Sequence, residues 1–134
     1  MQKLSIALFT FTVLFLGSSN GEAQQTTKQA AAATIQVIQF HSEHRCISCL
    51  KIEKFTRATL ANYFSSVPFL LVNVDDKKNE KLAEQFEATG TALFLFNPKT
   101  GKKKNLTEFA FMKIGNETLF DTELKKYIEE FLKG

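Results

Sequence analysis

Cys46 and Cys49 are the only cysteines in this 134-residue sequence, and two residues separate them. A disulfide between them would close a very short loop, which removes little entropy from the unfolded chain. Structural cross-linking is therefore a poor explanation for the pair. Thiols at this spacing either exchange disulfides or bind a soft metal, so the spacing indicates one of these two chemistries.

The residues around the pair favour a thiolate at its first member. A strand pattern, alternating apolar and polar residues, covers residues 34–41, and a helical pattern covers residues 46–64. Cys46 would then lie at a helix start, where free N–H groups and the helix dipole stabilise negative charge. Arg45 and, when protonated, His44 place further positive charge beside it.

We therefore predict that Cys46 is the attacking nucleophile and that Cys49 is the resolving thiol. A thiolate attacks a disulfide sulfur, and a second thiol within reach then resolves the mixed disulfide. The spacing places Cys49 about one helical turn beyond Cys46. His41, at the end of the expected strand, is a further candidate for tuning the reactivity of the two thiols.

The rest of the chain predicts alternating strands and helices. We expect a strand at 69–74 covered on both faces, a helix at 79–88 ended by Gly90, a strand at 91–96, a turn at 97–101, a strand within 103–111 and a helix at 117–132. A helix between the first two strands implies that they pair in parallel, and the tight turn implies an antiparallel hairpin. The expected apolar face of the first helix comprises Ile47, Leu50, Ile52, Phe55, Leu60, Tyr63 and Phe64. These elements predict an α/β fold with a mixed central sheet flanked by helices.

The N-terminal residues have the pattern of a secretory signal peptide. Lys3 precedes an apolar run at residues 4–16, and small residues follow that run. We assign residues 1–23 to the signal peptide, 24–33 to a polar linker and 34–134 to a single domain. The alternative is an uncleaved N-terminal anchor, although the apolar run is short for a membrane span. The pattern indicates an exported protein, periplasmic or extracellular, and we expect a bacterial envelope.

From about residue 34 to residue 132 the sequence resembles the thioredoxin superfamily. The resemblance rests on the strand IQVIQF before the motif, on Arg45-Cys46-Ile47-Ser48-Cys49, on the segment FLLVNVDD, and on the strand LFLF with its turn. It implies a thioredoxin-like three-layer α/β fold and a redox-active dithiol at Cys46 and Cys49. It also implies a thiol–disulfide oxidoreductase without a cofactor, acting on the thiols or disulfides of exported proteins. Its partners would include a membrane or periplasmic electron donor or acceptor, and we expect a monomer.

The sequence departs from the family's pattern at three places. Thioredoxins have Gly-Pro between the cysteines, where this chain has Ile47-Ser48. The family's buried acid has no counterpart, because Gln39 or Phe40 occupies that region, so His41 is one candidate to replace it. The family's cis-proline should fall near Thr91, which the resemblance makes a candidate for the substrate groove.

Two further functions fit the same residues. His41 and His44 with the two cysteines contain the ligand types of zinc or copper sites, so the protein could bind a soft metal or a metalloid. Alternatively, the domain is non-catalytic and the cysteines form an unreactive local disulfide. We assign no metal ligands, and we expect Glu53 and Lys54, on the same helix, to be exposed.

The charge of the chain argues against a nucleic-acid partner. The formal net charge is only +3, and the basic run Lys102-Lys103-Lys104 is expected on a solvated turn. No stripe of basic residues interleaved with aromatic residues is present in the sequence.

Overall fold

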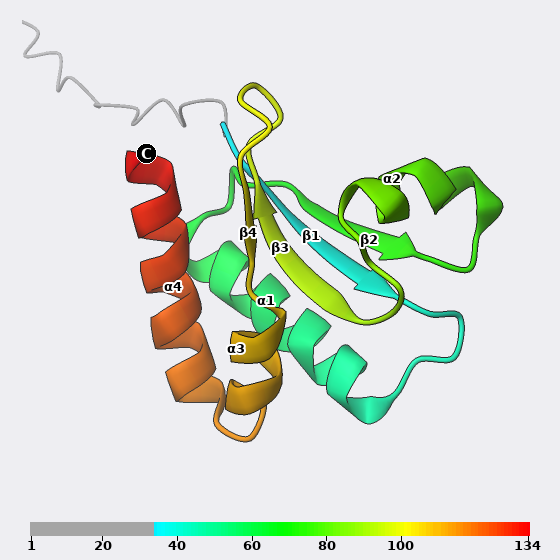
Figure 1. Cartoon of the computed structure of the whole chain (residues 1–134). Helices are drawn as coiled ribbons and strands as arrows, with labels where there is room; N and C mark the ends of the chain where they lie inside the picture. The colour runs from blue at the N-terminus through cyan, green and yellow to red at the C-terminus, as the bar shows by residue number, and fades with distance from the viewer. Residues whose placement is uncertain (1–33) are drawn as a thin grey trace, which may run out of the picture.

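The computed structural model describes residues 34–134. Its elements, in chain order, are β1 (Gln36–His41), α1 (Ile47–Tyr63), β2 (Phe69–Asn73), the short 3-10 helix η1 (Lys77–Asn79), α2 (Glu80–Gln85), β3 (Ala92–Phe96), β4 (Lys103–Asn105), α3 (Thr107–Lys113) and α4 (Glu117–Lys133) (Figure 1). The predicted signal peptide at 1–23 and linker at 24–33 lie outside the described residues. Within residues 34–134, no helix is long and apolar enough to cross a membrane.

The four strands form one mixed sheet in the order β2-β1-β3-β4. β1 and β2 run parallel, with Val37 opposite Phe69, as expected for two strands joined by a helix. β3 runs antiparallel to both β1 and β4. The predicted fold class, a thioredoxin-like three-layer α/β fold with a mixed sheet flanked by helices, is confirmed.

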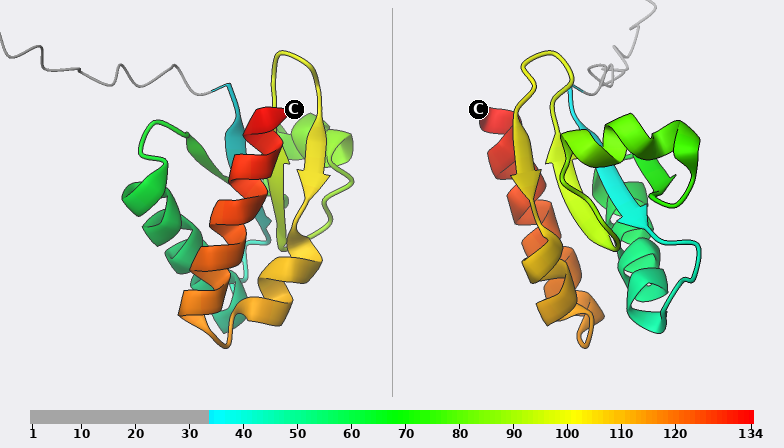
Figure 2. Two further views of the ribbon diagram at one scale, coloured as in Figure 1. Left: turned by 90° about the vertical axis from the view of Figure 1, so that its left-hand side faces the viewer. Right: turned by 45° about the vertical axis from the view of Figure 1, so that its right-hand side comes forward.

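The two faces of the sheet are covered by different helices. α1, α3 and α4 cover one face, and α2 lies on the other (Figure 2). Because side chains alternate along a strand, β1 contributes Val37 to the first core and Ile38 and Phe40 to the second. Gln39 therefore points to the same face as Val37, toward α1. This alternation places one polar side chain beneath the first turns of that helix.

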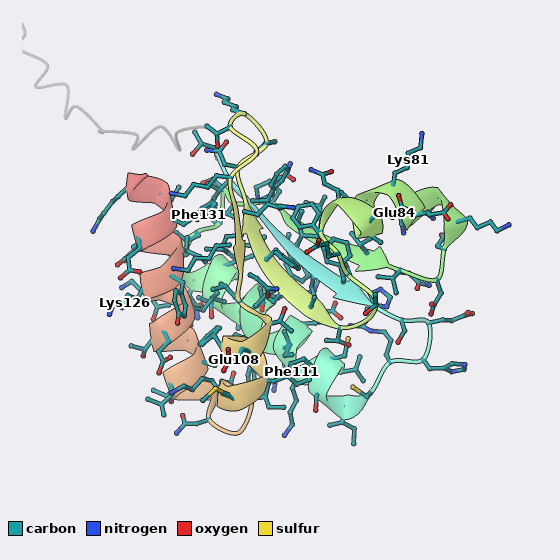
Figure 3. All side chains as sticks on the ribbon, in the orientation of Figure 1. Lys81, Glu84, Glu108, Phe111, Lys126 and Phe131 are labelled. Carbon is teal, nitrogen blue, oxygen red and sulfur yellow. The ribbon has the colours of Figure 1, made fainter. Side chains whose placement is uncertain are left out.

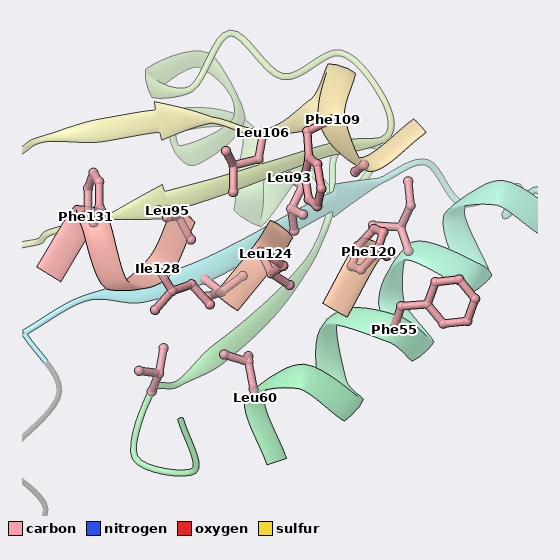
Figure 4. Packing of buried hydrophobic residues seen from close by; sticks show 14 of the residues in the cluster. Phe55, Leu60, Leu93, Leu95, Leu106, Phe109, Phe120, Leu124, Ile128 and Phe131 are labelled. Carbon is pink, nitrogen blue, oxygen red and sulfur yellow. The ribbon is translucent and has the colours of Figure 1, made fainter. Parts of the chain in front are cut away.

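The larger core lies between the sheet and the three helices α1, α3 and α4 (Figure 4). Phe120 of α4 is fully buried there, with its ring centroid 5.5 Å from that of Phe55 and 5.1 Å from that of Phe109. α1 is therefore fixed from both sides, by the sheet and by α4. A firmly packed α1 gives the residues at its N-terminus a defined position.

The expected strand within 103–111 is confirmed as the three-residue β4, but the helix α3, which was not expected, occupies most of the remaining range. β4 ends at Asn105, whose Oδ1 accepts a hydrogen bond of 2.9 Å from the Thr107 N–H and so starts α3. Thr107 Oγ1 in turn accepts a 3.1 Å bond from Leu93 N–H, and Leu106 N–H donates to the Leu93 carbonyl at 2.7 Å. α3 then buries Phe109 and leaves its neighbours Glu108 and Phe111 more exposed (Figure 3).

The first helix was placed correctly, but part of its predicted apolar face was wrong. Ile47, Leu50 and Tyr63 are 75%, 48% and 49% exposed. The face that α1 buries comprises Cys49, Ile52, Phe55, Thr56, Thr59 and Leu60. Of the two threonines, Thr59 has polar partners, since its Oγ1 lies 3.0 Å from the Phe55 carbonyl oxygen and 2.8 Å from Asp121 Oδ1. The buried Thr56 hydroxyl has no hydrogen-bond partner among residues 34–134.

Three smaller expectations also need correction. β2 is an edge strand and is mostly half-buried, whereas its apolar run predicted a strand covered on both faces. α2 ends at Gln85, and the chain leaves it through Glu87, whose φ is +52°, before reaching Gly90. The run Lys102-Lys103-Lys104 enters β4, and its three ammonium groups lie 4.7–5.2 Å from the ring centroids of Phe131, Phe86 and Tyr127.

Candidate functional site

Cys46 is the N-cap residue of the 17-residue helix α1. Its backbone is extended, with φ −81° and ψ 163°, and its carbonyl accepts the first helical hydrogen bond from Leu50 N–H at 3.1 Å. The side chain makes no capping hydrogen bond, and the first turn contains no acidic residue. The Cys46 thiol is thus exposed, free and next to the positive end of the helix dipole. This is the position predicted from the sequence.

Cys49 is only 1% exposed and is also a free thiol. It lies one turn into α1 and faces the sheet. Gln39 of β1, which is 0% exposed, donates from Nε2 to the Cys49 carbonyl at 2.9 Å and contacts the Cys49 sulfur at 3.5 Å. The pair therefore combines one accessible sulfur with one buried sulfur.

Arg45 reaches past the exposed cysteine to the buried one. Its Nη2 lies 3.4 Å from the Cys49 sulfur and 2.6 Å from Glu53 Oε2. The other oxygen of Glu53 accepts a 2.8 Å bond from Arg57 Nε, at the i,i+4 spacing on α1. A connected row of hydrogen bonds and ion pairs therefore runs from the Cys49 thiol through Arg45 and Glu53 to Arg57.

The pKa values of Arg45 and Glu53 reflect this arrangement. For Arg45, partial burial acts against the charged form, but the hydrogen bonds to Cys49 and Glu53 outweigh it and raise the pKa of the guanidinium. For Glu53, partial burial favours the neutral form, but the bonds from Arg45 and Arg57 outweigh it and lower the pKa of the carboxyl. Both groups are therefore charged at neutral pH, and each charge is compensated.

No hydrogen bond joins either histidine to a thiol in the part of the chain that the structure describes. His41 Nδ1 lies 2.8 Å from the carbonyl oxygen of Ser42, so the ring is bound to its own loop. His44 is exposed in that loop. Thr91 is half-buried and directly precedes β3, whose first residue Ala92 pairs with Phe40. No hydrogen bond joins Thr91 to either cysteine in residues 34–134, and its predicted role at a substrate groove stays a prediction.

A metal site receives no support from the described part of the chain. Across residues 34–134, no three His, Cys, Asp or Glu side chains are grouped so that they could hold a metal ion. His41, His44, Cys46 and Cys49 therefore share a sequence segment without forming such a group.

Sequence reasoning missed two residues of this site. Gln39 was recognised only as a position where an acid was absent, and Glu53 was expected to be exposed, whereas its side chain is 17% exposed. Glu53 follows Cys49 by four residues, and therefore lies on the same helix face. That spacing, together with Arg45 before the motif, was the available signal for an ion pair beside the buried thiol.

Comparisons with known proteins add little to this description. No family model matches the chain, and neither does any curated protein. One solved structure, described as that of a malarial protein, is 24% identical, with a match that covers 60% of this chain and 96% of that one at a TM-score of 0.43. At this TM-score the likeness supports no conclusion about fold or function.

Proposed function

We propose that this protein is a thiol–disulfide oxidoreductase that acts on the thiols or disulfides of exported proteins through Cys46 and Cys49. The observation that carries the proposal is the asymmetry of the pair: the N-cap residue of a long helix carries an exposed thiol, and a buried thiol lies one turn further on. Disulfide exchange needs this division, because the exposed sulfur must reach the substrate and the buried sulfur must reach the exposed one.

The exchange proceeds through a mixed disulfide between Cys46 and a substrate cysteine. In the reducing direction, the Cys46 thiolate attacks the substrate disulfide and releases one substrate thiolate. Cys49 then attacks the Cys46 sulfur, which closes the Cys46–Cys49 disulfide and releases the second substrate thiolate. The oxidising direction is the reverse of these two steps.

The surroundings of Cys46 suit a polypeptide substrate. Ile47 is 75% exposed and Leu50 is 48% exposed, and both lie on the first turn of α1 beside the reactive sulfur. Exposed apolar side chains at this position offer contacts to the residues that flank a substrate cysteine. Export, and with it an electron-exchange partner in the envelope, is proposed from the N-terminal sequence pattern alone.

Trapping the mixed disulfide tests the proposal. Cys49→Ser should accumulate a covalent adduct with a disulfide-bonded protein such as insulin, because the resolving thiol is absent. Cys46→Ser should form no adduct, since Cys49 is buried. The adduct is read on a non-reducing gel and by mass spectrometry. If neither variant forms an adduct and the wild type does not accelerate insulin reduction by dithiothreitol, the proposal is wrong and a non-catalytic role is favoured.

A further inference from the structure

Two N–H donors converge on the sulfur of the buried cysteine. Arg45 Nη2 lies 3.4 Å from Cys49 Sγ, and Gln39 Nε2 lies 3.5 Å from the same atom. Cys49 is 1% exposed and Gln39 is 0% exposed, so water has little access to this sulfur. Donors in such surroundings stabilise negative charge on the acceptor more strongly than they would in water.

The orientation of the Gln39 amide is fixed by a second contact. Its Nε2 donates to the Cys49 carbonyl oxygen at 2.9 Å, and a carbonyl oxygen can only accept. The amide therefore presents N–H groups, and not its own oxygen, to the Cys49 sulfur. The Gln39 oxygen points elsewhere and has no partner among the described residues.

The position of Arg45 is fixed as well. Its Nη2 also binds Glu53 at 2.6 Å, and Arg57 holds the other oxygen of Glu53 at 2.8 Å. The Arg45 side chain is 22% exposed, and the Glu53 side chain is 17% exposed. The guanidinium is thus held against the sulfur by an ion pair that is itself anchored on α1.

We propose that the Cys46–Cys49 pair is a disulfide donor, and that Arg45 and Gln39 favour this direction by stabilising Cys49 as the leaving thiolate. The inference rests on the proposed function and specifies the direction of its redox reaction. It makes Arg45 and Gln39 catalytic residues, because both contact a reacting sulfur, and it makes Glu53 a positioning residue.

The step that these donors assist can be written in full. A substrate thiolate attacks the Cys46 sulfur of the disulfide form, an S–S bond to the substrate forms, and the Cys46–Cys49 bond breaks. The bonding electron pair leaves on Cys49, next to the N–H groups of Arg45 and Gln39. A second substrate thiolate then attacks the substrate sulfur of the mixed disulfide and releases Cys46. The substrate dithiol is oxidised by two electrons, and the protein disulfide is reduced by two.

The same donors disfavour the reverse direction. A stabilised thiolate is a better leaving group and a weaker nucleophile, so Cys49 leaves readily and attacks less readily. Stabilising the reduced form also raises the oxidising power of the disulfide at equilibrium, as in strongly oxidising dithiol–disulfide proteins. Reoxidation after each turnover then requires a disulfide of a partner, for which oxidised glutathione serves as the probe.

The test is the equilibrium between the protein and glutathione, measured for the wild type and for variants of the two donors. Arg45→Met should make the disulfide form about tenfold more stable toward reduction, which corresponds to about 30 mV for this two-electron couple. Gln39→Leu should shift the equilibrium in the same direction. Lys54→Met is the matched control, because it removes one positive charge from an exposed site on the same helix.

The outcomes separate the inference from the proposed function. A shift for Arg45→Met and Gln39→Leu, with none for Lys54→Met, supports the inference. If both donor variants match the wild type, or if Lys54→Met shifts the equilibrium as much as Arg45→Met, the inference is wrong although the exchange activity stands. If the wild type does not titrate reversibly between dithiol and disulfide, the proposed function itself fails. Circular dichroism of each variant verifies folding, and Gln39→Leu decides the inference if Arg45→Met does not fold.

Discussion

Arg45 precedes the exposed cysteine in the sequence, but its guanidinium contacts the buried one, with Nη2 3.4 Å from the Cys49 sulfur. The chain turns from an extended N-cap into α1 at Cys46, which allows the preceding side chain to fold back along the helix. A residue expected beside the Cys46 sulfur thus contacts the Cys49 sulfur. The two sulfurs consequently have different neighbours, the helix N-terminus for Cys46 and the side-chain donors Arg45 and Gln39 for Cys49.

The difference in exposure predicts the order in which the two thiols are alkylated. In the reduced, folded protein Cys46 should react with iodoacetamide at least about tenfold faster than Cys49, which is 1% exposed. Quenched samples, digested and analysed by mass spectrometry, give the modified fraction of each cysteine. In urea the two rates should become similar. Equal rates in the folded protein would contradict the observed burial of Cys49.

Glu53 should influence the redox equilibrium only through Arg45. Glu53→Gln keeps the size of the side chain but loosens the guanidinium, so we expect a shift toward the disulfide form of about two- to threefold, smaller than that of Arg45→Met. In an Arg45→Met background the same change should have no further effect, because a double-mutant cycle reports coupling between contacting residues. Additive shifts in the glutathione titration would show that Glu53 acts independently of Arg45.

The lowered pKa of the Glu53 carboxyl predicts a pH-dependent contribution to stability. Its ordinary value is 4.5 and the folded value is lower, so the folded state gains stability from the ionised carboxylate above about pH 4.5. This contribution is lost as the pH falls through the lowered pKa. The difference in unfolding free energy between wild type and Glu53→Gln should therefore be largest near pH 7 and shrink in acid. Urea denaturation at pH 7, 5, 4 and 3 measures it, and a difference constant across these values would contradict the prediction.

Phe120 should be among the most costly positions to truncate. It is 0% exposed and lies between Phe55 and Phe109, where α1, α3 and α4 meet. Phe120→Ala should lower the free energy of unfolding by about 3–5 kcal/mol, as expected for an aromatic side chain removed from a core. Phe111→Ala, on α3 and 40% exposed, is the matched control and should cost less than about 1.5 kcal/mol. Urea denaturation of both variants checks the contrast.

The sequence was sufficient for the order of the four strands and of the helices α1, α2 and α4, and for the position of the cysteine pair. The pattern of β1, the turn at 97–101 and the amphipathic stretch of α4 are local features, and each determines its element without help from the rest of the chain. α3 was missed because phenylalanines at 109 and 111 imitate strand alternation. Its helix depends on a local hydrogen bond at Asn105 and on a core that accepts Phe109, which no short window of sequence reveals.

The site was predicted only in part, for a similar reason. Helix position alone determines the surroundings of Cys46, so that residue was placed correctly. The partners of Cys49 come from two directions, since Gln39 lies ten residues earlier on β1 and Glu53 lies four residues later on α1. Their convergence depends on the face that β1 turns toward α1, which becomes known only once strand register and helix packing are fixed.

The hydroxyl of Thr107 also bears on where a strand from another molecule could add to the sheet. Addition of a strand from another molecule requires backbone groups that are still free to pair. On the outer side of β3, the Leu93 N–H is bound by Thr107 and the Leu93 carbonyl by Leu106, so the start of that strand offers no template. Within residues 34–134 the edges of the sheet are therefore the three-residue β4 and, at the opposite side, β2. At β2 the guanidinium of Arg57 lies 4.6 Å from the centroid of the Phe69 ring and places a charge over the apolar side chain.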